Sequence, residues 1–188
     1  MTKLNWGILG TGWIAHEMGA ALNAVNGEIY AVCDVTLEGA KKYADEFGVT
    51  KAYGSSDELI ADDNVDIIYI ATPHSLHYKL LLQSVKAGKH VFCEKSITVN
   101  SRQLEECVAI AQEKGLVICD GVTLLHMPLY KKLGEIVASG AIGDVKMVQV
   151  NFGSCKEYDV NNRFFSKDLA GGALLDIGVY ATSFARFF

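Results

Sequence analysis

The stretch Gly7-Ile8-Leu9-Gly10-Thr11-Gly12-Trp13-Ile14-Ala15 decides how the rest of the chain is interpreted, because an apolar run leads directly into glycines and then into a helical sequence. It contains the pattern G-x-G-x-x-A at Gly10, Gly12 and Ala15. In a strand-to-helix turn the first glycine permits a tight turn, the second lets the backbone approach a pyrophosphate, and the alanine lets the helix lie close to the strand. Free amides at the helix start would receive the phosphates. The segment therefore predicts a dinucleotide-binding loop.

An acidic residue at the end of the second apolar run strengthens this interpretation. Asp34 follows the run Ile29 to Cys33, where a carboxylate can accept hydrogen bonds from both hydroxyls of an adenosine ribose. The alternative is that Asp34 only caps the helix expected from Leu37.

The residues around Asp34 also bear on the choice of cofactor. Val35 and Thr36 follow it, not an arginine that would welcome a 2′-phosphate, so NAD is favoured over NADP. The carboxylate would repel that phosphate, although Lys41 and Lys42 on the next helix leave NADP open.

Strand-like apolar runs alternate with helical segments up to about residue 120. The runs are Asn5 to Leu9, Ile29 to Cys33, Ile67 to Ile70, His90 to Cys93 and Leu116 to Cys119, and the helical segments include Leu37 to Phe47, Ser75 to Lys86 and Ser101 to Lys114. Glycines at 48, 88 and 115 are expected to end these helices, and Asn100 or Ser101 to cap the last one. The run Ile67 to Ile70 does not alternate with polar residues, so both its faces should be buried in a parallel sheet. This predicts an α/β fold of the Rossmann type, with a doubly wound parallel sheet.

The character of the sequence changes after Gly121. Pro128 to Ser139 is expected to be a helix, and Lys146 to Phe152 alternates as a half-exposed, antiparallel strand would. We expect residues 1–121 to form the dinucleotide-binding domain and residues 122–188 to begin an incomplete α+β substrate and oligomerisation domain.

Composition excludes several classes of function. The 188 residues carry a net charge of −5, half of them are hydrophobic, and no basic stripe is present, so nucleic acid is not an expected partner. No apolar stretch reaches the roughly 20 residues needed to cross a bilayer, and Met1 leads into structured sequence without a signal region, so we expect no membrane association and a cytoplasmic location. The five scattered cysteines suggest reduced thiols. No metal site is expected, because the close pair His74 and His77 has no cysteine ligand near it.

Three further segments carry a resemblance to a known family. They are Ala71-Thr72-Pro73-His74-Ser75-Leu76-His77, Gly88-Lys89-His90-Val91-Phe92-Cys93-Glu94-Lys95-Ser96 and Gly171-Gly172-Ala173-Leu174-Leu175-Asp176-Ile177-Gly178-Val179-Tyr180. With the glycine loop, they resemble the motifs of the glucose-fructose oxidoreductase / inositol dehydrogenase / MocA (Gfo/Idh/MocA) family, and tyrosine at the last position is associated there with dihydrodiol-dehydrogenase-like and certain sugar-dehydrogenase members.

The resemblance implies an NAD(P)-dependent dehydrogenase that transfers a hydride between the nicotinamide and a secondary alcohol of a sugar, polyol or dihydrodiol. Lys95 would hydrogen-bond the reacting hydroxyl, Asp176 would orient the substrate, and Tyr180 would be the base, with His77 as the next candidate. The residues implied in cofactor binding are Gly10, Thr11, Gly12, Trp13, Ile14, Asp34, Ala71, Thr72, Pro73, His77, Glu94 and Lys95.

The residue types suit this chemistry, but simpler roles remain open. A free phenol has a pKa of about 10, so a tyrosine base working near neutral pH needs a cation such as an ammonium beside it. Asp176 and Tyr180 are four residues apart and share a face if that segment is helical. Alternatively, Lys95 is a surface lysine paired with Glu94, and Tyr180 is a half-buried aromatic.

The sequence departs from the family pattern in two places. Ser96 replaces the usual proline after Lys95, which loosens the restraint on the presentation of Lys95, and Leu124-Leu125 replaces a segment that in many relatives contains an arginine.

Two other functions remain open for a chain of this kind. A non-catalytic dinucleotide-binding module would not need Lys95, Asp176 and Tyr180, and an adenosylmethionine-dependent methyltransferase would more commonly carry G-x-G-x-G. Relatives continue well past the last motif, so we expect the 188 residues to be a truncated piece that binds the cofactor but turns over little. We also expect self-association through its exposed strand edge and apolar last helix.

Overall fold

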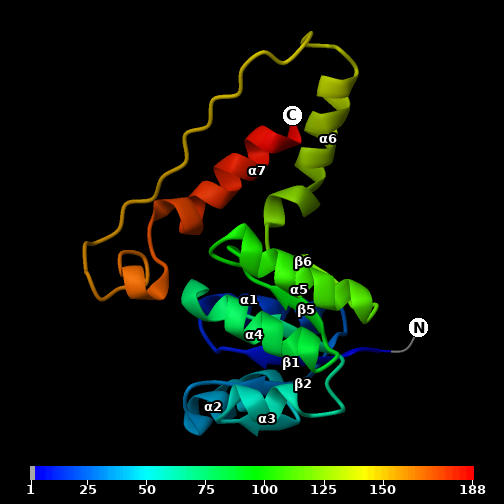
Figure 1. Cartoon of the computed structure of the whole chain (residues 1–188), viewed down its shortest axis with the longest axis vertical. Helices are drawn as coiled ribbons and strands as arrows, with labels where there is room; N and C mark the ends of the chain where they lie inside the picture. The colour runs from blue at the N-terminus through cyan, green and yellow to red at the C-terminus, as the bar shows by residue number, and fades with distance from the viewer. Residues whose placement is uncertain (1–2) are drawn as a thin grey trace. The chain divides into compact units, whose positions relative to one another are not determined.

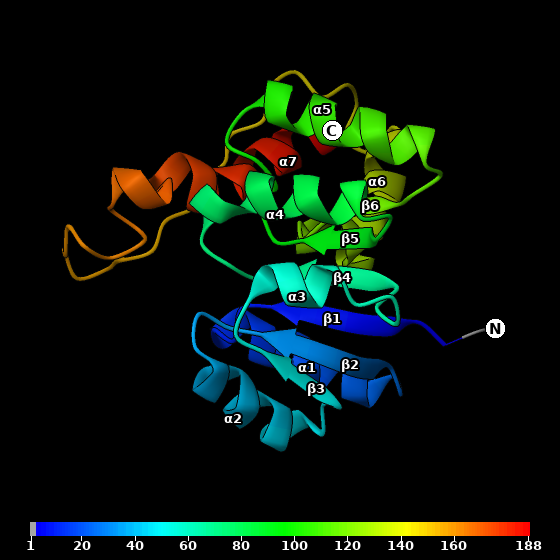
Figure 2. The same ribbon diagram turned by 60° about the horizontal axis from the view of Figure 1, so that its bottom comes forward.

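Parallel strands form a single sheet in the part of the chain up to Asp120. The computed structural model describes residues 3–188, and within them the sheet has six strands in the order β3-β2-β1-β4-β5-β6, all paired in parallel (Figures 1 and 2). The strands are β1 (Asn5–Leu9), β2 (Glu28–Cys33), β3 (Lys51–Tyr53), β4 (Ile67–Ile70), β5 (His90–Cys93) and β6 (Ile118–Asp120). This is the strand order of the Rossmann fold, so the predicted doubly wound sheet is confirmed.

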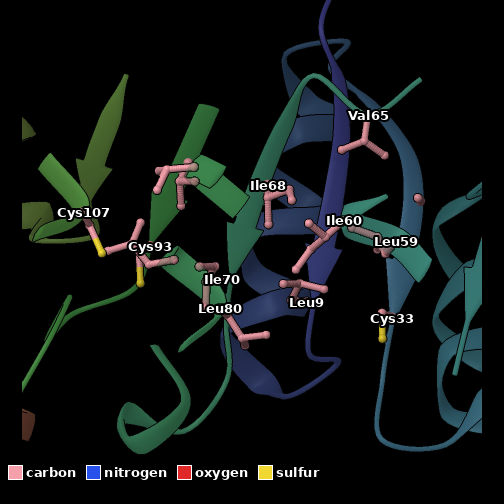
Figure 3. Close-up of a cluster of buried hydrophobic side chains, with 14 of the residues drawn as sticks. Leu9, Cys33, Leu59, Ile60, Val65, Ile68, Ile70, Leu80, Cys93 and Cys107 are labelled. Carbon is pink, nitrogen blue, oxygen red and sulfur yellow. The ribbon is translucent and has the colours of Figure 1, made fainter. Parts of the chain in front are cut away.

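Helices cover both faces of this sheet. They are α1 (Trp13–Ala24), α2 (Leu37–Phe47), α3 (Ser56–Ile60), α4 (His74–Lys86) and α5 (Ser101–Glu113). One apolar core joins the sheet to α3, α4 and α5 (Figure 3), and a second joins it to α1 and α2. Ile68 and Ile70 of β4 belong to the first core and Tyr69 to the second, and all three are almost completely buried. The expected burial of both faces of this strand is confirmed.

Short polar signals set the ends of the helices. The Asn100 side chain accepts a hydrogen bond from Gln103 N at 3.1 Å and caps α5, as expected. Gly48 ends α2 in a left-handed conformation with φ of 70°. Such a φ disfavours side chains, which is why glycine is common at this position.

Two elements of the first unit were not expected from the sequence. The strand β3 has three residues and the helix α3 five, too short for a periodic pattern to show. Elsewhere the boundaries move by one or two residues. The helix α4 begins at His74 rather than Ser75, and β6 covers Ile118–Asp120 rather than Leu116 to Cys119.

Residues from Gly121 onward form a second compact unit, distinct from that of Met1–Asp120. Its elements are η1 (Thr123–His126), α6 (Pro128–Ala138), η2 (Lys167–Leu169), η3 (Leu174–Gly178) and α7 (Val179–Phe187). Within it, Tyr130 of α6 contacts the rings of Phe184 and Phe187 of α7, with centroids 5.5 and 5.0 Å apart, and Figure 1 shows the two helices side by side.

The strand expected at Lys146 to Phe152 is absent, and that prediction was wrong. The alternation is present, because Val148 and Val150 are partly buried while Met147 and Gln149 are exposed. A strand, however, needs a neighbour to receive its backbone hydrogen bonds, and none of the described residues of this unit provides one. The segment therefore runs without regular secondary structure, and the strand edge on which self-association was expected does not form.

Candidate functional site

The glycine loop closes tightly between three strands. Gly10 has φ of 98°, and its N–H donates to Cys33 O at 2.8 Å. A Cβ on Gly10 would lie 2.7 Å from Ala71 O, closer than real Cβ contacts. Both the backbone conformation and the contact exclude a side chain, so Gly10 brings the ends of β1, β2 and β4 together.

Gly12 differs from Gly10 because the space above it is open. It is the N-cap of α1, and a Cβ there would meet no atom of the described residues within 4 Å. Ala15 on the next turn is fully buried, and its carbonyl accepts a hydrogen bond from Tyr43 Oη at 2.7 Å. The helix start is thus packed on its inner side and accessible at its first amides, as an anion-binding N-terminus requires.

Asp34 does not cap α2. That role belongs to Thr36, whose Oγ1 accepts from Gly39 N at 3.1 Å. The Asp34 carboxylate instead lies against Gly39, where any side chain would overlap it. No hydrogen bond joins this carboxylate to the described residues, so it retains the capacity to accept hydrogen bonds from a ligand. The simpler alternative for Asp34 is therefore wrong.

A buried hydroxyl without a partner lies after β4. Thr72 Oγ1 is inaccessible to solvent and has no hydrogen-bond partner among the described residues, and the Thr72 methyl group lies near Gly10. A buried hydroxyl usually has a partner, because leaving it unpaired costs about 1 to 3 kcal/mol. Pro73 follows as the N-cap of α4. The orphaned hydroxyl and the open space at Gly12 fit a dinucleotide at this edge.

His77 is fully buried at the start of α4. Its Nδ1 lies 2.7 Å from Ser96 O and its Nε2 2.8 Å from Thr72 O. Burial, the largest effect, lowers the pKa of His77, while the two carbonyls act in the opposite direction. With both ring nitrogens directed at the backbone, this position does not suit a base that exchanges a proton with a substrate.

Glu94 and Lys95 follow β5 at the same edge of the sheet. Tyr69 Oη donates to Glu94 Oε1 at 2.6 Å, and Lys95 N donates to Glu94 Oε2 at 3.3 Å. Burial, with the Glu94 hydrogen bond as a second cause, raises the pKa of Tyr69 well above its usual range. Tyr69 therefore stays protonated and holds the carboxylate as a donor. The peptide bond between Lys95 and Ser96 is cis.

Asp176 and Tyr180 belong to the second unit. The residues from Leu174 to Phe187 are continuously helical, first as a π-helix and then as α7, so the two side chains are about one turn apart. Arg163 Nη1 lies 3.9 Å from Asp176 Oδ1, an ion pair at the edge of contact. Tyr180 packs edge-to-face on Phe152 with ring centroids 5.7 Å apart.

A cavity of about 370 Å³ adjoins Tyr180 within this unit. Its lining residues are mostly apolar, and they are Thr123, Leu124, Val150, Asn151, Phe152, Tyr180, Ala181 and Phe184. Leu124 stands where many relatives carry an arginine according to the resemblance, so this wall offers no cation. The cavity suits an uncharged ligand with an apolar surface.

Several contributing residues were not found from the sequence. Tyr69 hydrogen-bonds Glu94, Arg163 lies 3.9 Å from Asp176, and Phe152 packs on Tyr180. For Tyr69 a signal was present, because it is the one hydroxyl-bearing residue in the apolar run Ile67 to Ile70. The other two depend on tertiary contacts that no spacing reveals.

The described residues contain neither a metal-binding cluster nor a membrane-spanning helix. Within residues 3–188, no cluster of three or more His, Cys, Asp or Glu side chains could bind a metal ion. None of the helices in that range has the length and hydropathy needed to span a bilayer.

Family models match almost the entire chain. The model of the Gfo/Idh/MocA oxidoreductase family, described as an NAD-binding Rossmann fold, matches residues 4–121, and a Gfo/Idh/MocA C-terminal domain matches residues 130–188. The chain belongs to the Gfo/Idh/MocA family. The family predicted from the sequence motifs is confirmed, and so is the assignment of the glycine loop to an NAD-binding fold.

Individual relatives show how similar this chain is to known proteins and how much of each one it covers. The trans-1,2-dihydrobenzene-1,2-diol dehydrogenase of Xenopus laevis is 37% identical over 182 residues, 95% of this chain and 54% of the relative. The D-xylose 1-dehydrogenase (NADP+) of Hypocrea jecorina is 36% identical over 94% of this chain and 51% of the relative. The crystal structure of KijD10, a 3-ketoreductase from Actinomadura kijaniata in complex with NADP and TDP-benzene, has a TM-score of 0.85 at 28% identity, covering 98% of this chain and 58% of that one. The chain spans about half the length of the curated relatives that it matches.

Proposed function

We propose that this Gfo/Idh/MocA chain is part of an NAD(P)-dependent dehydrogenase that transfers a hydride between the nicotinamide and a secondary alcohol of a sugar, polyol or dihydrodiol. The observation that carries the proposal is the partnerless hydroxyl of Thr72, a residue whose methyl group lies near Gly10, at the end of the sheet where Glu94 and Lys95 follow β5. A ligand with polar groups would suit this place, because the carboxyl ends of the strands there offer both an anion-binding helix start and an ammonium.

The two units would divide the work. Residues 1–121 would bind the dinucleotide, with the amides of Gly10 to Ile14 at the pyrophosphate and Asp34 at the adenosine ribose. Ala71, Thr72 and Pro73 would lie along the cofactor, and Glu94 and Lys95 near its reactive end. Residues 122–188 would begin the substrate domain, with Asp176 and Tyr180 directed to the alcohol.

The mechanism assigns a separate task to each side chain. The nicotinamide, when bound, supplies the hydride acceptor. Lys95 donates a hydrogen bond to the reacting hydroxyl and stabilises the negative charge that develops on its oxygen. Tyr180 accepts the proton of that hydroxyl through its phenolate form. Asp176, whose carboxylate lies near Arg163, orients the substrate.

The relatives support this choice of chemistry. A dihydrodiol dehydrogenase, a D-xylose dehydrogenase and a 3-ketoreductase all interconvert a hydroxyl and a carbonyl group. The apolar cavity beside Tyr180 favours a ring with few hydroxyls, such as a dihydrodiol, over a heavily hydroxylated sugar.

The test is a dehydrogenase screen of the full-length protein with NAD and NADP against polyols, sugars and dihydrodiols. We expect turnover with at least one class, a loss of kcat of about 100-fold or more in Lys95→Ala with unchanged cofactor affinity, and a missing basic limb in the pH profile of Tyr180→Phe. Tight cofactor binding without turnover of any substrate would instead identify a non-catalytic dinucleotide-binding module.

Location and assembly are proposed on separate grounds. The five cysteines are unpaired, and three of them are buried, which suits a reducing compartment such as the cytoplasm. Exposed apolar side chains in the second unit, including Leu129, Met147 and Leu174, favour a homo-oligomer. The net charge of −5 speaks against a nucleic-acid partner, and no membrane partner is proposed. Sedimentation of the full-length protein checks the oligomer.

A further inference from the structure

One buried side chain joins the segments that follow β4 and β5. His77 places Nδ1 at 2.7 Å from Ser96 O and Nε2 at 2.8 Å from Thr72 O. Thr72 comes two residues after β4, and Ser96 comes directly after Lys95. The imidazole therefore bridges a residue proposed to contact the cofactor and the residue next to the proposed catalytic ammonium.

The surroundings of His77 hold its ring in place. The ring is fully buried and packs edge-to-face on His74, with centroids 5.5 Å apart. Burial is the largest cause that lowers the pKa of His77. Lys95 is linked to the ring through Ser96, the next residue in the chain, whose carbonyl lies 2.7 Å from Nδ1. A ring fixed on three sides can restrain the chain to which it is bonded.

The hydrogen bond to Ser96 lies at the position where this sequence lacks the proline of the family motif. Ser96 stands in the place of the proline that usually follows Glu-Lys in the related motif, and proline would fix the backbone φ at that residue. A hydrogen bond from a buried ring to the Ser96 carbonyl restrains the same residue by other means.

We propose that His77 is a positioning residue for Lys95, with its Nδ1–H donating to the Ser96 carbonyl and thereby fixing where the Lys95 ammonium is presented. The catalytic consequence rests on the proposed function. The restraint on Lys95 itself does not, because it concerns only atoms of this chain. His77 thus acts through Lys95 and takes no proton from the substrate.

Two amide variants separate the two ends of the ring. In His77→Asn the shorter side chain carries an N–H donor near the place of Nδ1 and retains the bond to Ser96 while losing that to Thr72. In His77→Gln the longer side chain carries its donor near the place of Nε2 and does the reverse. Both variants introduce a neutral amide at the same buried position, so each serves as the control of the other.

The position of the Lys95 side chain can be measured by NMR, without an assay of enzymatic turnover. Reductive methylation with ¹³C-formaldehyde gives each lysine an NMR signal, and the Lys95 signal is the one that Lys95→Arg removes. We expect this signal to shift by more than its line width in His77→Gln and to stay within it in His77→Asn. The signal of Lys79, exposed on the same helix, should not move in either variant. Equal shifts in both variants, or none in either, overturn the proposal.

Kinetics of the full-length protein give the second measurement. We expect kcat to fall at least 10-fold in His77→Gln and less than 3-fold in His77→Asn, with the KM for the cofactor unchanged in His77→Gln, which keeps the bond to Thr72. If the unaltered protein turns over no alcohol, the proposed function fails while the Lys95 signal still decides the positioning role.

The unaltered protein provides a test that does not depend on the folding of a variant. Long-range ¹H–¹⁵N correlation reports which ring nitrogen of His77 carries a proton. A proton on Nδ1, with or without one on Nε2, is required. A neutral ring protonated only on Nε2 would leave Nδ1 unable to donate to Ser96 and would overturn the proposal.

Discussion

Tyr69 Oη donates a 2.6 Å hydrogen bond to Glu94 Oε1. A buried residue of a central strand thus determines the position of an acidic group at the carboxyl end of the neighbouring strand. Tyr69 is 1% exposed and lies on β4, whereas Glu94 follows β5. Because strands β4 and β5 are paired in register from Ile67–His90 to Ile70–Cys93, the two residues cannot separate without disrupting the sheet.

The first prediction removes this bond. Tyr69→Phe should lower the free energy of unfolding by about 1.5 to 3 kcal/mol, the usual worth of a hydrogen bond to a charged group. Tyr78→Phe is the matched control, since Tyr78 Oη also donates to a glutamate, Glu106, at 2.6 Å, but at the surface. Urea denaturation followed by circular dichroism measures both. Equal effects of the two substitutions would show that burial does not strengthen the Tyr69 bond.

The second prediction separates two glycines of the loop. Gly12→Val places methyl groups in open space, so the thermal midpoint of the free protein should be almost unchanged while the NAD dissociation constant rises 10-fold or more. Gly10→Val should instead prevent folding, because of its positive φ and the nearby Ala71 carbonyl. Thermal melts and calorimetry with NAD provide the comparison. Unchanged NAD affinity in Gly12→Val would place the pyrophosphate elsewhere.

The third prediction concerns the choice between cofactors. The unbonded Asp34 carboxylate should make NAD bind several-fold more tightly than NADP, and Asp34→Ala should narrow this difference. A shallow pocket of about 500 Å³ along α2 is lined by Lys41 and Lys42, among others. These lysines would favour a 2′-phosphate once the Asp34 carboxylate is removed. Calorimetric titration of both cofactors decides the matter, and tighter binding of NADP to the unaltered protein would contradict the role given to Asp34.

The fourth prediction is a pH dependence of stability. The backbone N–H of Asn64, the Tyr53 hydroxyl and the Lys51 ammonium all donate to Asp62, which holds the pKa of that carboxyl well below its usual range. Because the pKa is lower in the folded protein, this carboxylate stabilises the fold above about pH 4, and the contribution disappears as the pH falls. Asp62→Asn should therefore be less stable than the parent at pH 7.

Urea midpoints from pH 7 to pH 3 test this dependence. The difference between Asp62→Asn and the parent should shrink as the pH falls through 4. Asp63→Asn, at the neighbouring exposed position, is the control and should show no such trend. A difference that stays constant with pH would assign the loss to packing rather than to charge.

Most of the first unit could be predicted from its sequence, because its signals are local. The glycine pattern at residues 10 to 15 and the non-alternating run of β4 follow from the rules of backbone conformation and burial. The boundaries of α2, at Leu37 and Phe47, agree because Thr36 and Gly48 mark them.

The second unit was harder for physical reasons. Lys146 to Phe152 alternates in sequence, but a strand also needs a partner, which no local pattern guarantees. Similarly, the proximity of Arg163 to Asp176 and the bonds of His77 to Thr72 and Ser96 arise only when segments distant in sequence meet.

The opposite packing of α1 and α4 has a consequence for how such a protein changes over time. The helix after β1 packs in one core and the helix after β4 packs in the other. The two chain segments therefore leave neighbouring strands toward opposite faces of the sheet, at the point where Gly10 lies against Ala71. In sheets of this kind the ligand site is a by-product of that winding. The location of the site could therefore change only if the packing of both cores changed. The choice of ligand, in contrast, depends on a few residues in the loops that follow the strands. Selection can therefore alter exposed loop positions such as Gly12 without endangering the fold, whereas Gly10, packed against Ala71, cannot change.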